Sequence, residues 1–174
     1  MRIKKILTVV LSLAMVTAML SSFMINSSAA SYTNYYSSSG TVWFNATNLH
    51  VQLGVYELTF SRTSGHTLSY YVEAYPPSQR YGFVYLDIIK ESDYSTQVHT
   101  DYIPGGNGGQ AIATGTVELG NGKYDYTAIV IIQCPNEHWK TTMTFTGTIS
   151  VSGTGTTSTM IFNTDNTAYN YTYI

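Results

Sequence analysis

The sequence predicts an all-β protein, an antiparallel β-sandwich of the jelly-roll or Ig-like type. Apolar and polar residues alternate over most of the chain, turn residues separate the alternating runs, and no window carries the apolar stripe of a helix. Many short strands separated by turns are typical of sandwiches and barrels. Aromatic and β-branched residues are abundant, which argues against disorder.

The N-terminal segment has the order of a secretory signal peptide of the kind used in bacterial export. Arg2, Lys4 and Lys5 precede an uncharged apolar run over residues 6–20, and small residues then lead to a cleavage site after Ala30. The apolar run is short for a membrane span, although an uncleaved anchor is the alternative. We therefore expect a secreted, extracellular protein with no membrane contact after cleavage.

Cleavage would leave a chain of single-domain size. The expected organisation is a signal peptide over 1–30, a polar leader over 31–40 and one β-sandwich domain over 41–174. Five basic and ten acidic residues would remain, so nucleic acid is an unfavourable partner for this surface. Cys134 is the only cysteine in the chain and has no partner for an internal disulfide.

The strands follow one another with short connections. They are predicted at 41–47, 50–61, 67–75, 81–90, 94–102, 110–119, 123–133, 138–151, 157–163 and 167–173. Between the fifth and sixth, IPGGNGGQ (103–110) is rich in glycine but lacks the lysine and following helix of a phosphate-binding loop. It is interpreted as a flexible connection.

The dipeptide Asn121-Gly122 is a strong signal for a two-residue hairpin turn of type I′. Such a turn would pair strand 110–119 with strand 123–133, placing Leu119 opposite Tyr124. It would also bring Glu118 opposite Asp125. Two like charges at that position would be screened by water, bind a cation, or share a proton as a glycosidase pair does.

The stretch VIIQCPNEHWK (130–140) combines Cys134, Glu137 and His138. Pro135 cannot donate to a central ladder, so the stretch is interpreted as the loop between two strands. Pairing Gln133 with His138 would extend one apolar face from strand 123–133 to strand 138–151. A catalytic thiolate–imidazole pair is the alternative, but the sequence supplies no orienting group or oxyanion hole for it.

A second hairpin is predicted from LSYYVEAY (68–75) and YGFVYLDIIK (81–90), with Tyr75 opposite Tyr81. One face would then be apolar and form core, with the cross-strand neighbours Leu68/Ile88, Tyr70/Leu86, Val72/Val84 and Ala74/Gly82. The other face would gather aromatic rings and two carboxylates, which are the predicted ligand-binding residues: Tyr71, Glu73, Tyr75, Tyr81, Phe83, Tyr85 and Asp87.

Such a face suits an extended glycan. The apolar C–H faces of sugar rings stack on aromatic side chains, while carboxylates accept hydrogen bonds from sugar hydroxyls. Exposed aromatic patches mark interaction sites, but another strand, a loop or the 31–40 segment would alternatively cover this one. No metal ligand set, catalytic constellation or cofactor motif is identified: the four histidines lack ligand spacing, and no calcium-loop pattern occurs.

LSYYVEAY resembles the tyrosine-rich strand that carries the nucleophile in small β-jelly-roll xylanases. The resemblance covers about eight residues and implies a jelly-roll fold. Ser69 stands where that family has glutamate directly before the tyrosine pair. This departure, together with a short mature chain and no evident second catalytic glutamate, puts the family's activity in doubt.

Three functions remain open. The first is a secreted non-catalytic binding module for a polysaccharide, cell-surface or matrix ligand. The second is an interaction or self-assembly protein whose tyrosine-rich strands, including YNYTYI (169–174), add to a partner's sheet edge. The third is a small extracellular glycoside hydrolase that uses Glu73, Asp87 or the Glu118/Asp125 pair. The sequence does not fix the ligand, the strand order or the oligomeric state.

Overall fold

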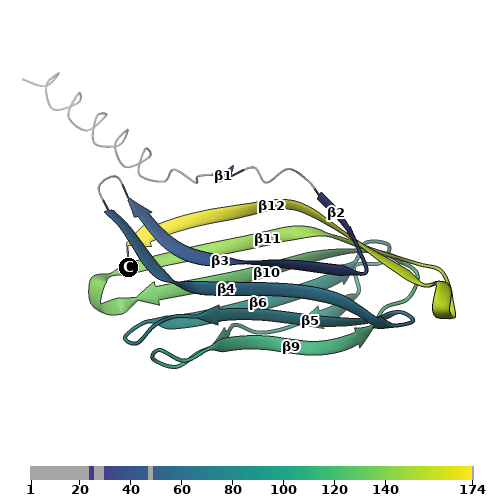
Figure 1. Cartoon of the computed structure of the whole chain (residues 1–174), viewed down its shortest axis with the longest axis horizontal. Coiled ribbons are helices and arrows are strands. Elements are labelled where there is room, and N and C mark those ends of the chain that lie inside the picture. The colour runs from purple at the N-terminus through teal and green to yellow at the C-terminus, as the bar shows by residue number, and fades with distance from the viewer. Residues whose placement is uncertain (1–23, 26–29, 47–48, 174) are drawn as a thin grey trace, which may run out of the picture.

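The computed structural model describes residues 24–25, 30–46 and 49–173. They form two antiparallel sheets packed face to face, which confirms the predicted all-β sandwich (Figure 1). The predicted signal peptide falls almost entirely outside the described residues. No helix in the described part of the chain has the length and apolarity needed to cross a membrane.

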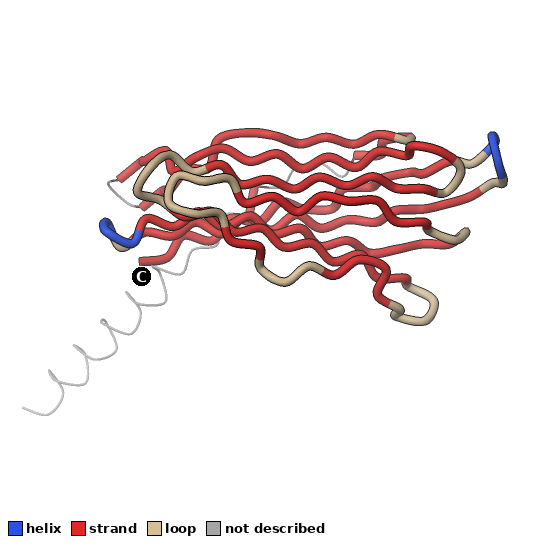
Figure 2. The backbone as a smooth tube through the Cα atoms, turned by 90° about the horizontal axis from the view of Figure 1, so that it is seen from below, coloured by secondary structure: helices blue, strands red, loops and turns tan. Residues whose placement is uncertain are grey.

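The larger sheet, sheet A, has the order β1-β12-β11-β10-β6-β7, with β2 also on β12 and β8 also on β6. Its strands are β1 (Met24–Ile25), β2 (Ala30–Thr33), β6 (Tyr81–Lys90), β7 (Thr96–His99), β8 (Ile103–Pro104), β10 (Gly122–Cys134), β11 (Trp139–Ser152) and β12 (Thr159–Tyr173). Sheet B has the order β3-β4-β5-β9. Its strands are β3 (Tyr35–Ala46), β4 (Leu49–Ser64), β5 (Thr67–Tyr75) and β9 (Ala111–Glu118). Two 3-10 turns, η1 (Pro135–Glu137) and η2 (Gly155–Thr157), lie at opposite ends of the sandwich (Figure 2).

The core lies between the inward faces of the two sheets because alternate side chains of a strand point to opposite faces. Phe60 of β4 shows how the sheets interlock. Its ring centroid lies 5.0 Å from that of Tyr126 on β10 and 5.9 Å from that of Phe162 on β12. All three side chains are buried. Aromatic contacts across the two sheets therefore add to the burial of apolar surface, which is the main stabilising contribution.

The first strands begin earlier than the sequence predicted. Residues 31–40, expected as a polar leader, lie in β2 and the first part of β3. Their small side chains have a packing role: a Cβ added to Gly40 would lie 3.2 Å from the Tyr56 ring, and Ser38 hydrogen-bonds Tyr56 at 3.2 Å. A Tyr/Ser/Gly run lacks the apolar alternation of a strand, so the sequence did not predict a strand here. The small residues are explained by the Tyr56 ring that packs against them.

The expected hairpin at Asn121-Gly122 is wrong. Strand β9 pairs with β5 in sheet B, whereas β10 pairs with β6 and β11 in sheet A. A type I′ turn needs a positive φ at both central residues, and Asn121 has none. The chain instead crosses from one sheet to the other here, and buried Leu119 donates its N–H to the carbonyl of His66. Glu118 and Asp125 consequently belong to different sheets and do not form the expected cross-strand pair.

The predicted bend at Cys134 is confirmed, with a register two residues from the expected one. Gln133 pairs with Lys140 instead of His138, and η1 fills the loop. A shift of two preserves the buried face, whereas a shift of one would reverse it. The Cys134 thiol is buried and donates to Glu137 Oε2 at 3.3 Å, while His138 ends the turn with a φ of 59°. The loop interpretation therefore accounts for this stretch.

Candidate functional site

The predicted ligand-binding residues lie on two opposite outer surfaces of the sandwich. β5 and β6 do not pair: β5 lies in sheet B between β4 and β9, and β6 lies in sheet A beside β10. Tyr71, Glu73 and Tyr75 therefore face outward from sheet B. A separate set of four, on β6, faces outward from sheet A: Tyr81, Phe83, Tyr85 and Asp87. The expectation of one continuous face is wrong, although the alternation along each strand was predicted correctly.

On sheet B the strand register brings a second glutamate beside the predicted one. Glu57 of β4 lies directly opposite Glu73 of β5, and Ser39 of β3 lies directly opposite Glu57. Cross-strand neighbours of this kind have Cβ atoms about 4.5–5.5 Å apart. Glu57 was not among the residues predicted for the site. The signal was Gly65 between two alternating runs, which predicts a hairpin that joins β4 to β5.

A shallow depression of about 480 Å³ lies over this pair on the outer face of sheet B. Its lining includes Glu57, Glu73, Tyr75, Ser39, Thr41 and Gln110. Tyr75 is 48 % exposed. The depression thus offers an aromatic ring, two carboxylates and two hydroxyls on strands that the sandwich holds rigidly, together with the amide of Gln110 just before β9.

Hydrogen bonds orient both carboxylates. Tyr71 Oη donates to Glu73 Oε2 at 2.8 Å, and Thr59 Oγ1 donates to Glu57 Oε1 at 3.1 Å. Burial, the hydrogen bond to Glu73 and the negative charges of Glu73 and Glu57 raise the pKa of Tyr71 to about 12. The Tyr71 hydroxyl therefore remains a donor over the physiological range, and the field at this face is negative.

The Tyr71 hydroxyl is expected to ionise near pH 12 instead of near its ordinary value of 10.0. Because the folded-state pKa is raised, this group's contribution to stability is complete below about pH 10 and is lost as the pH rises through about 12. The difference in tyrosinate absorbance between the native protein and Tyr71→Phe measures it. When Glu73→Gln is present, the ionisation of Tyr71 should move toward lower pH. If it does not move, Glu73 is not a cause of the raised Tyr71 pKa.

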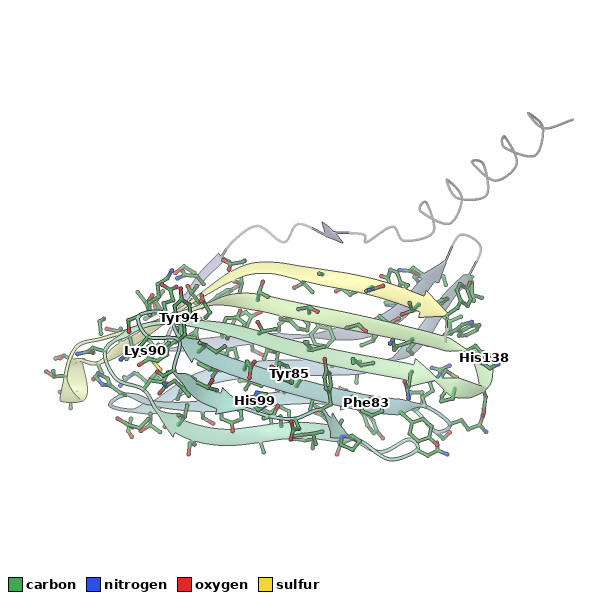
Figure 3. The ribbon with its side chains drawn as sticks, turned by 180° about the vertical axis from the view of Figure 1, so that it is seen from behind. Phe83, Tyr85, Lys90, Tyr94, His99 and His138 are labelled. Carbon is green, nitrogen blue, oxygen red and sulfur yellow. The ribbon has the colours of Figure 1, made fainter. Side chains whose placement is uncertain are left out.

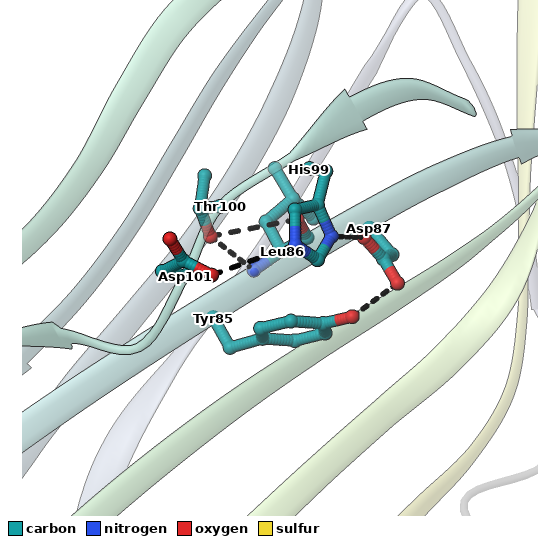
Figure 4. A network of polar contacts seen from close by, with 6 residues as sticks. All are labelled: Tyr85, Leu86, Asp87, His99, Thr100 and Asp101. Atoms are coloured by element: carbon teal, nitrogen blue, oxygen red, sulfur yellow. Dashed lines mark hydrogen bonds and ion pairs between the residues drawn. The ribbon is translucent and has the colours of Figure 1, made fainter.

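The outer face of sheet A carries a different cluster around Asp87 (Figures 3 and 4). Asp87 Oδ1 lies 2.6 Å from His99 Nδ1, and Asp87 Oδ2 accepts a hydrogen bond from the Tyr85 hydroxyl. His99 Nε2 also lies 3.7 Å from Asp101 Oδ1. The hydrogen bond to Asp87 is the main reason that the pKa of His99 is raised, with the charges of Asp87 and Asp101 adding to it and desolvation opposing it.

The second cluster also contains aromatic contacts. The Tyr102 ring stacks on Tyr85 with centroids 5.3 Å apart, and the His99 ring meets Tyr85 edge-on at 5.7 Å. The Tyr85 hydroxyl and both Asp87 oxygens already have partners within the cluster. The sequence prediction placed Tyr85 and Asp87 on an outer face correctly but missed His99 and Tyr102, which come from the segment that pairs with the edge of β6.

The two acids expected to pair have other partners. Glu118 accepts a hydrogen bond from Thr67 Oγ1 at 2.6 Å, and Asp125 lies near Glu91, whose carboxylate is 2.6 Å from Lys123 Nζ. Burial, followed by the charge of Glu91, raises the pKa of Asp125. Over the described residues, no three His, Cys, Asp or Glu side chains gather in a way that would hold a metal ion.

The depression on sheet B is the stronger candidate for ligand binding because it is hollowed, carries an exposed ring and retains free acceptor capacity on both carboxylates. Comparison with known proteins adds no assignment to this geometry: no family model, curated protein or solved structure matches the chain.

Proposed function

We propose that this protein is a secreted, non-catalytic binding module for a polysaccharide or cell-surface glycan, and that the sheet B depression is its binding site. One observation carries the proposal: Tyr75, Glu57 and Glu73 converge on a single depression of about 480 Å³. Small-molecule sites commonly have volumes of about 300–1,000 Å³ and combine apolar surface with a few fixed polar groups. The order of residues 1–30 supports export.

The chemistry of the depression suits a sugar ring. The exposed Tyr75 side chain supplies an apolar surface for the C–H face of a pyranose. The glutamates supply acceptors for its hydroxyl groups, and Gln110 both donates and accepts. Since Tyr75 and the two glutamates project from paired strands, little conformational entropy is lost when a ligand binds.

Tyr75→Ala is expected to weaken glycan binding about tenfold, since an aromatic contact contributes up to about 1.5 kcal/mol beyond its buried area. The measurement is a pull-down of the purified protein on insoluble polysaccharides and cell-wall material, followed by titration with soluble oligosaccharides that bind. Tyr94→Ala is the matched control. Tyr94 is 81 % exposed, does not line the depression, and lies between β6 and β7 of sheet A at one end of the molecule (Figure 3).

Each result of this experiment has a defined meaning. Retention of the native protein, with loss in Tyr75→Ala and none in Tyr94→Ala, supports the module and its site. No retention by the native protein would contradict the proposal. Release of reducing ends from a bound polysaccharide would replace it with a hydrolase, in which the paired carboxyls of Glu57 and Glu73 act as acid and nucleophile.

The C-terminal segment named by the self-assembly alternative has a strand partner on one side only among the described residues. Residues 169–173 already pair with β11 as part of β12. Tyr169 and Tyr171 pack against the chain's own core, and Tyr171 and Tyr173 contact the buried Phe44 ring edge-on at 6.1 and 5.3 Å. This segment therefore packs on the chain's own sandwich, and in the self-assembly alternative a partner strand would add at its other edge.

A further inference from the structure

The outer face of sheet B has a one-sided charge. Its outward positions carry Glu57, Glu73 and Glu118. Among the described residues of its four strands, the only lysine or arginine is Arg62, which pairs with buried Leu68 and so lies on the opposite face of the sheet. Its guanidinium bonds the Asn34 side chain and the Gly65 carbonyl instead of a carboxylate.

Glu57 and Glu73 form a like-charge pair at the centre of this face. Directly opposed like charges on neighbouring strands are destabilising. The ion pairs formed among the described residues involve Asp87, Glu91, His99, Asp101 and Lys123, so none of them compensates Glu57 or Glu73. A cation placed between the two carboxylates would remove this repulsion, so the free protein favours a positively charged ligand here.

The position of Tyr75 indicates the kind of cation. Tyr75 is the next outward residue after Glu73 on β5, about 7 Å along the strand, and Val55 lies beside it as Glu57 lies beside Glu73. A ring stacked on Tyr75 would therefore place a substituent over the carboxylate pair. A calcium ion needs six to eight oxygen ligands, more than two carboxylates supply, whereas an ammonium group donates three hydrogen bonds.

We propose that the depression selects a saccharide with a free, protonated amino group, such as a deacetylated hexosamine oligomer. The sugar ring stacks on Tyr75, and its ammonium group lies between Glu57 and Glu73 and donates to both. This inference rests on the proposed glycan-binding function and adds its ligand class. Polyanionic glycans are disfavoured at the same site because they would meet the negative charges of Glu57 and Glu73.

The test compares two ligands of equal length, a glucosamine hexamer and an N-acetylglucosamine hexamer, by titration calorimetry with the purified protein. The amino form is expected to bind about tenfold more tightly, which corresponds to two ion pairs of ordinary surface strength. The preference should shrink as the salt concentration rises from about 0.05 M to about 0.5 M, because exposed charges are screened.

The variants separate charge at the depression from charge elsewhere. Glu57→Gln with Glu73→Gln keeps side-chain size and the acceptor for Tyr71, and should abolish the preference for the amino form while binding of the acetylated form persists. Glu118→Gln is the control for position: it removes one negative charge from the same outer face, against two in the double variant. Glu118 lies three outward positions beyond the residue opposite Glu73, so its replacement should leave the preference intact.

Four outcomes would overturn the inference. They are equal binding of the two hexamers, an effect of Glu118→Gln equal to that of the double variant, a requirement for added calcium, or displacement of the glucosamine hexamer by an oligolysine of the same charge at an equal concentration. The first three leave glycan binding itself standing, and the fourth points to a basic peptide as the occupant. Failure of both hexamers and of every neutral glycan to bind would instead contradict the proposed function on which the inference rests.

Discussion

Phe60→Ala is expected to lower the free energy of unfolding by about 3–5 kcal/mol. The side chain is fully buried, and its ring contacts Tyr126 and Phe162 of the opposite sheet and Tyr36 of its own sheet. Alanine would leave a cavity between the two sheets that rigid strands cannot close. Equilibrium unfolding in urea, followed by the signal of the buried aromatic residues, measures the change.

Tyr35→Ala is the matched control for this prediction. It removes an aromatic ring from a strand of the same sheet, but Tyr35 is 57 % exposed. Its effect should stay within about 0.5 kcal/mol. If Phe60→Ala lowers the free energy of unfolding no more than Tyr35→Ala does, the two sheets do not pack against each other through the Phe60 ring.

Gly147→Ala is expected to cost about 3 kcal/mol, at the upper end of the range for overpacking. Gly147 lies at a register shift between β11 and β12. A Cβ at this position would meet the carbonyl oxygen of Asn163 and would lie 2.7 Å from the Tyr126 ring and hydroxyl. Relief requires movement of backbone in a central strand pair, because Tyr126 is itself buried.

Gly106→Ala isolates the steric cause. Its added Cβ would have no neighbour within 4 Å, and its φ lies outside the left-handed region. This substitution should be neutral or slightly stabilising, since alanine restricts the unfolded chain. Equal thermal midpoints for Gly147→Ala and the native protein would contradict the close packing of Gly147 on Tyr126.

The fold class and the buried faces were predictable because both follow from local alternation. The strands at 67–75 and 81–90 have their predicted bounds, and the residues assigned to core in them include Leu68, Val72 and Leu86, which are buried. Period-2 alternation states which side of a strand is apolar. It therefore identifies inward positions without reference to the rest of the chain.

Pairing between strands was not predictable in the same way. An apolar face can be covered by a neighbour in its own sheet or by a strand of the opposite sheet, and both leave the same alternation. Ala74 and Gly82 illustrate this: they were expected as cross-strand neighbours, and a Cβ on Gly82 would indeed lie 3.1 Å from Ala74 Cβ. They belong to different sheets, however. These two small residues lie close together at the point where the chain crosses from sheet B to sheet A.

The candidate site was half predictable for that reason. Alternation alone placed Tyr71, Glu73 and Tyr75 on one outer face, and the three residues do share the outer face of sheet B. Their neighbour Glu57 depends on the β4–β5 pairing, and its role emerges only when that register is known. Phe83, Tyr85 and Asp87 were assigned to the same face through a hairpin that does not form.

The most direct test of the binding site is an amide NMR titration of the isotope-labelled protein with a soluble oligosaccharide that it retains. We predict that the largest shifts fall on β3, β4 and β5 around Ser39, Glu57 and Tyr75, with Tyr85 and His99 on the opposite outer face unchanged. Shifts concentrated at Tyr85 and His99 would contradict the account and assign binding to sheet A instead.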